Sequence, residues 1–416
     1  MHFFIEKMGE LWAEDIRVMD LVKEYGTPLY IYSASTLRRH YRVFDSAFKE
    51  IPHLICFSVK SNSNLCILKL LKEEGAGADI VSGGELFRAL KAGIDPKKIV
   101  FSGVGKKTQE IKEALEADIL MFNVESIEEL YHINELASSL NKIARISFRV
   151  NPDVDPKTHP YISTGLRENK FGIEIKEAYE AYKLASKLSN IEPIGIDCHI
   201  GSQLTEISPF LEAWKRLKIL YDKLISSGFK IKYLDLGGGL GIRYKEEEPP
   251  HPVELGMALT EALKGLDLTL ILEPGRVIVG NAGILVTQVL YTKKIGDKNF
   301  VIVDAGMNDL IRPAFYGSYH RISEVVQKGR EEIVVDVVGP ICESGDFLAK
   351  NRKLPRVERG EYLAVFSAGA YGFVMSSQYN SRPRAAEVLV EKDKAFLIRK
   401  RETYEDLIRL EMDLCV

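Results

Sequence analysis

The stretch "CFSVKSNSN", residues 56–64, places a lysine where a buried strand is predicted to end. Residues 54–59 are apolar and rich in β-forming side chains, and serine and asparagine follow Lys60 before an apolar helical pattern resumes at Leu65. A lone lysine at a strand end is usually solvated. Lys60 is therefore a candidate for chemistry only if other strands bring reactive groups to the same place.

The pattern around Lys60 repeats along the chain. Short β-rich runs alternate with helix-period segments, for example residues 85–91 and 126–139. The eight runs span residues 54–59, 78–81, 98–102, 119–123, 145–150, 194–199, 233–236 and 269–273. Alternation of this kind predicts a parallel sheet with helical crossovers, and eight such units closing on themselves make a (β/α)8 barrel. We therefore predict an α/β fold built on a TIM-like barrel.

The pattern changes after about residue 278, where strand-like runs follow one another without helices of comparable length. These runs are "AGILVTQVLYTKKI", "FVIVDAG", "EIVVDVVGP", "EYLAVFS" and "RAAEVLVEKDKAFLIRK". They predict a mainly antiparallel C-terminal β domain, to which "TPLYIYS" at residues 27–33 is expected to add an edge strand. We expect an N-terminal segment at 1–34, the barrel at 35–278 and the β domain at 279–416.

Composition favours a small-molecule ligand over a nucleic acid or a membrane. The 416 residues include 56 basic and 59 acidic side chains, and no long basic tract stands out. No uncharged apolar run approaches the roughly 20 residues of a membrane span, and the first residues lack the apolar core of a signal peptide. The five cysteines are scattered, which indicates reduced thiols and a cytoplasmic protein.

Reactive side chains occur where several of the predicted barrel strands end, which is where barrel enzymes carry their chemistry. The strand ends carry Lys60, Asp79, His199, the glycines Gly237, Gly238 and Gly239, and Glu273. Each has an ordinary explanation by itself: a solvated lysine, a structural histidine, a tight turn or a loop cap. Together they are harder to explain that way, because all of them are expected at one mouth of the barrel.

One chemistry uses all of these groups. A lysine can hold an aldehyde cofactor as a Schiff base, a glycine loop can bind phosphate, an imidazole can stack on an aromatic ring, and a carboxylate can keep a pyridine nitrogen protonated. That cofactor is pyridoxal 5'-phosphate. No metal site is predicted, because His159 and His199 have no carboxylate or cysteine at ligand spacing.

At this point the motifs carry a family resemblance. In order, they are "FSVKSNSN", "GADIVSGGEL", "KFGI", "HIGSQ", "LDLGGGLGI", "EPGR", "DAGMNDLIRPAFYGSYH", "GPICESGD" and "GAYG". Over essentially its whole length the chain resembles the alanine racemase-like, fold type III group of pyridoxal phosphate enzymes, and within it the diaminopimelate decarboxylase family. Ser61 stands where members of that family often carry alanine, a departure that leaves Lys60 in place.

The resemblance implies a role for each matching residue. Lys60 would hold the cofactor covalently, His199 would stack on its ring, and Glu273 would pair with the ring nitrogen. The phosphate would be held by Ser202, Gly237, Gly238, Gly239, Gly275, Arg276 and Tyr371, and Asp79 would complete the cofactor site. The substrate would be bound by Arg276, Arg312, Tyr316, Glu343 and Tyr371. Cys342 would supply the proton that replaces carbon dioxide, and in this family it comes from the second subunit of a homodimer.

Two residues decide which activity is predicted. Glu273 strengthens the cofactor as an electron sink, as a decarboxylase needs, whereas the racemase branch places an arginine at that nitrogen. Arg312, beside Tyr316, offers a guanidinium fork for a distal carboxylate, which ornithine and lysine lack. We predict decarboxylation of meso-2,6-diaminopimelate to L-lysine. The alternatives are a carboxynorspermidine or other basic amino-acid decarboxylase of the same fold, and a catalytically silent cofactor-binding paralogue.

Overall fold

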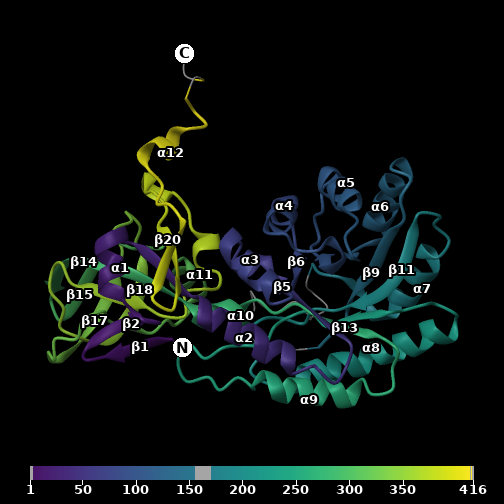
Figure 1. The fold of residues 1–416 in the computed structure, drawn as a ribbon, viewed down its shortest axis with the longest axis horizontal. Coiled ribbons are helices and arrows are strands. Elements are labelled where there is room, and N and C mark those ends of the chain that lie inside the picture. The colour runs from purple at the N-terminus through teal and green to yellow at the C-terminus, as the bar shows by residue number, and fades with distance from the viewer. Residues whose placement is uncertain (1–2, 155–169, 413, 415–416) are drawn as a thin grey trace. The chain divides into compact units, whose positions relative to one another are not determined.

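The computed structural model describes residues 3–154, 170–412 and 414. These residues divide into two compact units (Figure 1). One unit comprises residues 40–242 and 248–277, and we call it the barrel unit. The other comprises residues 1–39, 243–247 and 278–416, and we call it the β unit.

Eight parallel strands form a closed barrel in the barrel unit, as predicted. The strands are β5 (His53–Ser58), β6 (Gly77–Ile80), β7 (Ile99–Phe101), β8 (Met121–Val124), β9 (Ala144–Asn151), β11 (Ile191–Asp197), β12 (Tyr233–Asp235) and β13 (Thr269–Leu272). Each pairs with the next in that order, and β13 pairs with β5 to close the ring. The two-residue strand β10 (Ile173–Glu174) pairs in parallel with Val150 and Asn151 at the end of β9.

Helices connect the strands of the barrel (Figure 1). They are α3 (Leu65–Glu73), α4 (Gly83–Ala92), α5 (Thr108–Ala117), α6 (Ile127–Ser139), α7 (Ile175–Ala185), α8 (Ser208–Ser226) and α9 (Pro252–Ala262), with α2 (Ala34–Ser46) before β5 and the short α10 (Arg276–Val279) after β13. The polar residues after Lys60 begin α3, because the Asn64 side chain caps it by accepting a hydrogen bond from the Cys66 amide. The serine and asparagine run of the opening sequence is therefore a strand-to-helix turn.

Several strands end earlier than the sequence pattern predicts. Strand β5 ends at Ser58, and Lys60 lies in a 3-10 turn over Val59–Ser61. Strand β11 ends at Asp197, so the prediction that it continues to His199 is wrong by two residues. A run of β-forming residues does not indicate where the chain leaves the neighbouring strands. The predicted runs therefore include the first residues of the turns.

The β unit contains a mostly antiparallel sheet, which confirms the predicted class of the second domain. Its main path runs β18-β17-β15-β14-β4-β20-β21, and β19 pairs with β14 and β16. The strands are β4 (Leu29–Ser33), β14 (Gly283–Ile295), β15 (Lys298–Val303), β16 (Ile322–Glu324), β17 (Glu332–Val338), β18 (Phe347–Pro355), β19 (Tyr362–Val365), β20 (Ala386–Glu391) and β21 (Lys394–Arg399). The pairings β15–β17 and β4–β20 are parallel.

The predicted position of β4 at the sheet edge is wrong. Strand β4 lies between β14 and β20, and all five of its residues are buried. Its partners lie more than 250 residues further along the chain, and a local sequence pattern cannot predict a pairing over that distance. The remaining elements of this unit are the hairpin-like sheet β1 (Phe4–Lys7), β2 (Glu10–Ala13) and β3 (Ile16–Arg17), and the helices α1 (Val18–Tyr25), α11 (Arg312–Tyr316) and α12 (Tyr404–Ile408).

Candidate active site

The pairing register of the barrel strands places several candidate functional side chains at the same height in the barrel. Asp197 and Asp235 are paired residues at the ends of β11 and β12, and Glu273 follows the last residue of β13. On the other side of the ring, Ser58 at the end of β5 pairs with Asp79 in β6. The carboxyl ends of parallel strands share one face of a barrel, so these residues surround its mouth.

Lys60 reaches back over the strand ends and is engaged with an acid. Its Nζ lies 2.5 Å from Asp79 Oδ2 and 3.2 Å from Ser58 Oγ. The Asp79 side chain is fully buried, whereas that of Lys60 is 33% exposed. The second oxygen of Asp79, Oδ1, is buried without a hydrogen-bond partner among the described residues. The lysine predicted to carry chemistry is thus held by a buried carboxylate and faces accessible space.

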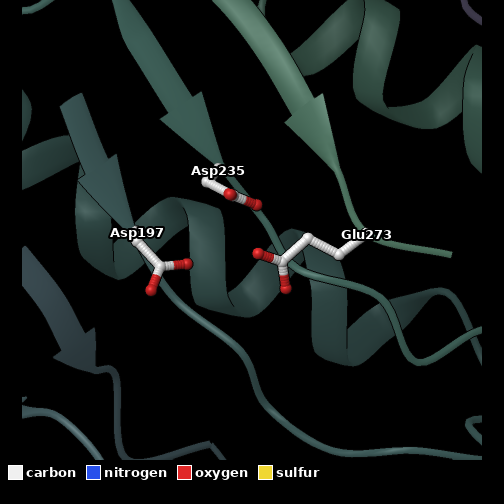
Figure 2. A group of neighbouring side chains, drawn as sticks. All are labelled: Asp197, Asp235 and Glu273. Carbon is white, nitrogen blue, oxygen red and sulfur yellow. The ribbon is translucent and has the colours of Figure 1, made fainter. Parts of the chain in front are cut away.

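Three further carboxyl groups form a cluster at the same mouth, and Figure 2 shows their side chains converging. Oxygens of Asp197, Asp235 and Glu273 lie within 4.8 Å of one another, and all three residues are buried. Burial and the neighbouring acids raise the pKa of each carboxyl group well above its ordinary value. We call these three residues the acidic cluster.

His199 and the glycine loop lie against each other. A Cβ at Gly237 would lie 2.8 Å from Cδ2 of His199, and a Cβ at Gly238 would lie 2.2 Å from the main-chain oxygen of Glu273. A Cβ at Gly239 would lie 2.5 Å from the main-chain oxygen of Gly201. Burial, followed by the charges of nearby cations, lowers the pKa of His199 well below its ordinary value. The neutral imidazole therefore packs on a loop that accepts no side chain.

Arg276 and Ser202, two predicted phosphate contacts, are adjacent. Arg276 Nη2 donates a hydrogen bond to Ser202 Oγ at 3.1 Å, and the arginine is 5% exposed. Gly275, just before α10, has room for no Cβ, because that atom would lie 2.9 Å from the Ser61 side chain. Backbone amides, a hydroxyl and a guanidinium are the groups that bind a phosphate dianion.

A buried ion pair that the sequence did not reveal acts electrostatically on the acidic cluster. Arg149 Nη1 lies 3.0 Å from Glu125 Oε1, and Glu125 Oε2 accepts the amide of Gly172 at 2.7 Å. The side chains are 9% and 3% exposed. Arg149 lies inside the predicted run 145–150. Because successive side chains of a strand point to opposite faces, this position could have been predicted to point inward.

A polar network of residues from β8, from β9 and just after β7 also reaches Glu273. The Asn123 amide nitrogen lies 3.0 Å from Ser102 Oγ and 3.4 Å from both Asp235 Oδ2 and Glu273 Oε1. Ser147 Oγ donates to Asn123 Oδ1 at 2.7 Å, which orients that amide. Asn123, Ser102 and Ser147 are therefore site residues that sequence reasoning missed, since single polar residues in apolar strands give no specific signal.

The other predicted site residues belong to the β unit. Arg312, at the start of α11, is 5% exposed, donates to Ser318 Oγ at 3.2 Å and lies over the ring of Tyr316 at 5.6 Å. Cys342 is exposed on the loop after β17, and its amide donates to Asn380 Oδ1 at 2.7 Å.

The neighbouring Glu343 is exposed on the same loop as Cys342. Tyr371 has a positive φ of 55°, a strained conformation for a bulky residue that is often found at functional sites. The β unit thus contains Arg312, Tyr316, Cys342, Glu343 and Tyr371, and the barrel unit contains the other predicted residues.

The side chains of the barrel mouth fit pyridoxal phosphate. The mouth provides an amine paired with a carboxylate, a neutral imidazole and a glycine loop without room for side chains. It also provides an arginine hydrogen-bonded to a serine hydroxyl, and a buried carboxyl group. Each matches one part of the cofactor: aldehyde, ring face, phosphate and ring nitrogen. His159 lies outside the described residues. Among the described residues, the acidic cluster is the single group with metal-ligand spacing.

Fold and site together define a barrel-type pyridoxal phosphate enzyme, and the sequence comparisons agree. Residues 34–280 match the family described as "Pyridoxal-dependent decarboxylase, pyridoxal binding domain". The chain is 56% identical to a diaminopimelate decarboxylase of Aquifex aeolicus over 98% of this chain and 96% of that protein. It is 57% identical to the enzyme of the same name from Haemophilus influenzae, over 99% of each. The chain belongs to the diaminopimelate decarboxylase family.

Solved structures agree with this assignment. The structure of diaminopimelate decarboxylase from Helicobacter pylori, complexed with L-lysine, has a TM-score of 0.93 and 48% identity over 95% of this chain and all of that one. A lysine/ornithine decarboxylase from Vibrio vulnificus has a TM-score of 0.79 at 22% identity, over 90% and 97% of the two chains, which shows a shared fold. In the part of the chain that the structure describes, no helix is both long enough and apolar enough to span a membrane.

Proposed function

We propose that this protein decarboxylates meso-2,6-diaminopimelate to L-lysine and carbon dioxide, the last step of lysine biosynthesis, with pyridoxal 5'-phosphate as cofactor. The observation that carries the proposal is the barrel mouth itself, which brings together Lys60 paired with Asp79, the buried Glu273 and a glycine loop with no room for side chains. The family assignment and the L-lysine in the Helicobacter pylori relative support the same substrate.

The barrel residues hold the cofactor in this proposal. Lys60 would hold the cofactor through its amine, and Asp79 orients that amine. The glycine loop would hold the phosphate together with Ser202 and Arg276. Gly275 allows the chain to approach closely, and Tyr371 adds a hydroxyl. When bound, pyridoxal phosphate withdraws electrons from the substrate's α-carbon, which permits loss of carbon dioxide.

Glu273 and His199 provide the environment of the ring. Glu273 would hold the ring nitrogen with a buried carboxyl group, where a charge acts more strongly than it does in water. His199 is neutral, so it can stack on the ring face without repelling a protonated nitrogen. The pair favours decarboxylation, because a protonated ring is the stronger electron sink.

The substrate's far end explains the residues of the β unit. Arg312 carries a planar fork suited to a carboxylate, and Tyr316 packs beside it. Glu343 matches the distal ammonium that diaminopimelate carries beside its distal carboxylate. Cys342 Sγ provides the proton for the carbon that carbon dioxide leaves. A diamine-forming decarboxylase has no need of Arg312, since its substrates end in an ammonium group alone.

We further propose a homodimer in which Cys342 and Glu343 of one subunit complete the barrel mouth of its partner. Their exposure on one loop supports a role outside their own hydrophobic core. We also place the enzyme in the cytoplasm, because all four described cysteines are free, as expected in a reducing compartment.

The function is tested with purified protein and a panel of substrates. The protein loaded with cofactor is incubated with meso-diaminopimelate, L-lysine, L-ornithine and carboxynorspermidine, and carbon dioxide and amines are quantified. We expect one L-lysine per carbon dioxide from meso-diaminopimelate, and at least about 10²-fold lower kcat/KM for the others, since those lack the carboxylate that Arg312 binds. Preferred turnover of carboxynorspermidine would support the alternative decarboxylase, and no turnover of any compound would support a silent paralogue.

A further inference from the structure

The acidic cluster would carry three negative charges if all of its carboxyl groups were ionised, and a buried site does not stabilise that much charge unaided. Asp197, Asp235 and Glu273 are 2%, 0% and 3% exposed, and their oxygens converge within 4.8 Å (Figure 2). Two unit charges about 4 Å apart repel by about 4 kcal/mol at an effective dielectric constant near 20. Three ionised carboxylates at this distance therefore need a neutralising partner.

The nearby cations are already paired with other acids. The charged groups acting on the cluster are Lys60, Arg149, Asp79 and Glu125. Lys60 is 2.5 Å from Asp79, and Arg149 is 3.0 Å from Glu125. Two cations thus serve five carboxyl groups, which leaves three negative charges if every acid is ionised. His199 adds no positive charge, because its lowered pKa keeps it neutral.

The thiols beside the cluster are neutral as well. Cys56 and Cys198 are buried next to these acids, and burial raises the pKa of both thiols well above the ordinary value. They add neither positive nor negative charge near neutral pH. The groups that face the cluster from β5, β6, β9 and β11 therefore leave its charge uncompensated.

The Gly237 amide donates a short hydrogen bond to Asp235 Oδ1 at 2.9 Å. The side-chain donors that reach the cluster are few, and their bonds are long. Asn123 reaches Asp235 and Glu273 only at 3.4 Å, and Ser102 reaches Glu273 at 3.3 Å. Asp197 Oδ1 is buried with no hydrogen-bond partner among the described residues. A buried carboxylate normally accepts two or more short bonds, so at least one member of the cluster is better accommodated as the neutral acid.

We propose that the acidic cluster stores at least one proton near neutral pH, and that Asp197 and Asp235 are positioning residues that set the charge on Glu273. A proton shared between neighbouring carboxyl groups removes one charge and creates an O–H···O bond, as in other carboxyl pairs at this distance. The inference rests on the proposed function only where it assigns Glu273 to the cofactor's ring nitrogen. The remaining negative charge of the aspartates would keep that nitrogen protonated to higher pH.

Infrared spectroscopy of the intact, cofactor-loaded protein tests the stored proton. Protonated carboxyl groups absorb apart from carboxylates, and the band shifts when the carboxyl carbon is ¹³C. The spectrum is recorded at about pH 8.5, where ordinary carboxyl groups are ionised. We expect a band that shifts with ¹³C-labelled aspartate or with ¹³C-labelled glutamate. This measurement uses wild-type protein and does not depend on a variant that folds.

Variants assign the band to the cluster. The Asp197→Asn/Asp235→Asn pair should remove or shift it. Asp309 is a buried acid of the β unit, and Glu85 is a half-buried acid outside the cluster, near Asp79 and Lys60. The pKa of each is raised to about 7, so both are ionised at the pH of the experiment. Glu85→Gln and Asp309→Asn should therefore leave the band unchanged. Absence of any carboxyl band would overturn the proposal, as would a band insensitive to the cluster variants. A stoichiometric divalent ion found in place of the band would also overturn it.

A pH profile tests the positioning role. Removing the charge of Asp197 or Asp235 weakens proton binding at Glu273 and the ring nitrogen, so the alkaline limb of kcat/KM should move to lower pH by about one unit. A purely structural role lowers activity at all pH values alike, and that result would overturn the positioning claim. Because the infrared band needs no substrate, a protein with the band but without diaminopimelate turnover would contradict the proposed function and leave the stored proton standing.

Discussion

At the scale of single residues, burial decides which acids and bases of the barrel mouth have the accessibility and proton affinity that catalysis needs. Lys60 is partly exposed yet bonded to a fully buried aspartate, so it is both reachable and oriented. Glu273 is 3% exposed and surrounded by other acids. Such surroundings perturb proton affinities, and perturbed groups in a cleft mark functional sites. A substitution at Glu273 tests this residue's role, and a second one tests Arg312 of the β unit.

Glu273→Gln should lower kcat by about 10² or more while cofactor stays bound. The amide keeps the shape and hydrogen bonding of the side chain but cannot stabilise a protonated ring nitrogen by charge. Steady-state kinetics gives kcat, and the absorbance of released cofactor gives occupancy. Near-normal turnover at full occupancy would refute the electron-sink role of Glu273.

Arg312→Lys should raise KM for meso-diaminopimelate by about 30-fold, equivalent to about 2 kcal/mol, with a smaller change in kcat. Lysine keeps the charge but lacks the fork that fits a carboxylate, and it stacks less well on Tyr316. Arg321→Lys is the matched control, since Arg321 is an exposed arginine that also lies over an aromatic ring, that of Phe366. Equal KM values for the two variants would show that Arg312 does not anchor the substrate.

At the scale of elements, the ends of strands and the loops after them build the site. The sequence predicts the eight barrel strands, because β-forming runs and helix-period segments alternate without interruption. It also predicts Lys60 and Glu273, which lie within two residues of a strand end. Asp197 and Asp235 were missed, because the predicted runs continue past the true ends of β11 and β12 and so treat both acids as strand interior.

Gly238→Ala tests the closed glycine loop. Its Cβ would lie 2.2 Å from the main-chain oxygen of Glu273, so either the loop or the chain at Glu273 must move. We expect cofactor affinity to fall by at least about tenfold, or about 1.4 kcal/mol, in a titration of stripped protein. Gly105→Ala is the control, because no atom lies within 4 Å of its Cβ position. Unchanged affinity in Gly238→Ala would remove the loop from the cofactor site.

At the scale of the whole molecule, long-range pairing limits what the sequence can predict. Strand β4 reads as an edge strand, yet it pairs with β14 and β20 in the sheet interior. The ion pair of Arg149 and Glu125 likewise joins neighbouring strand ends and has no sequence spacing of its own. The proposed assembly of two chains would be a further long-range property, and it is tested by mixing inactive variants.

Lys60→Ala and Cys342→Ala should each be severely impaired alone, since one lacks the cofactor amine and the other the proton donor. When equal amounts are unfolded and reassembled together, about half of the dimers should be hybrids with one intact site each, so about a quarter of wild-type activity should return. Size measurements establish that hybrids form. An inactive mixture that contains hybrids would mean that Cys342 acts within its own chain.

Everything proposed for the barrel mouth depends on Lys60, so its link to the cofactor is the most direct measurement. The purified protein is treated with borohydride, which makes the link stable to digestion, and the peptides are analysed by mass spectrometry. We predict a single modified peptide, with the cofactor mass on Lys60, and none in the Lys60→Arg variant. A cofactor fixed to another lysine, or no modified peptide from protein that demonstrably contains the cofactor, would contradict the assignment.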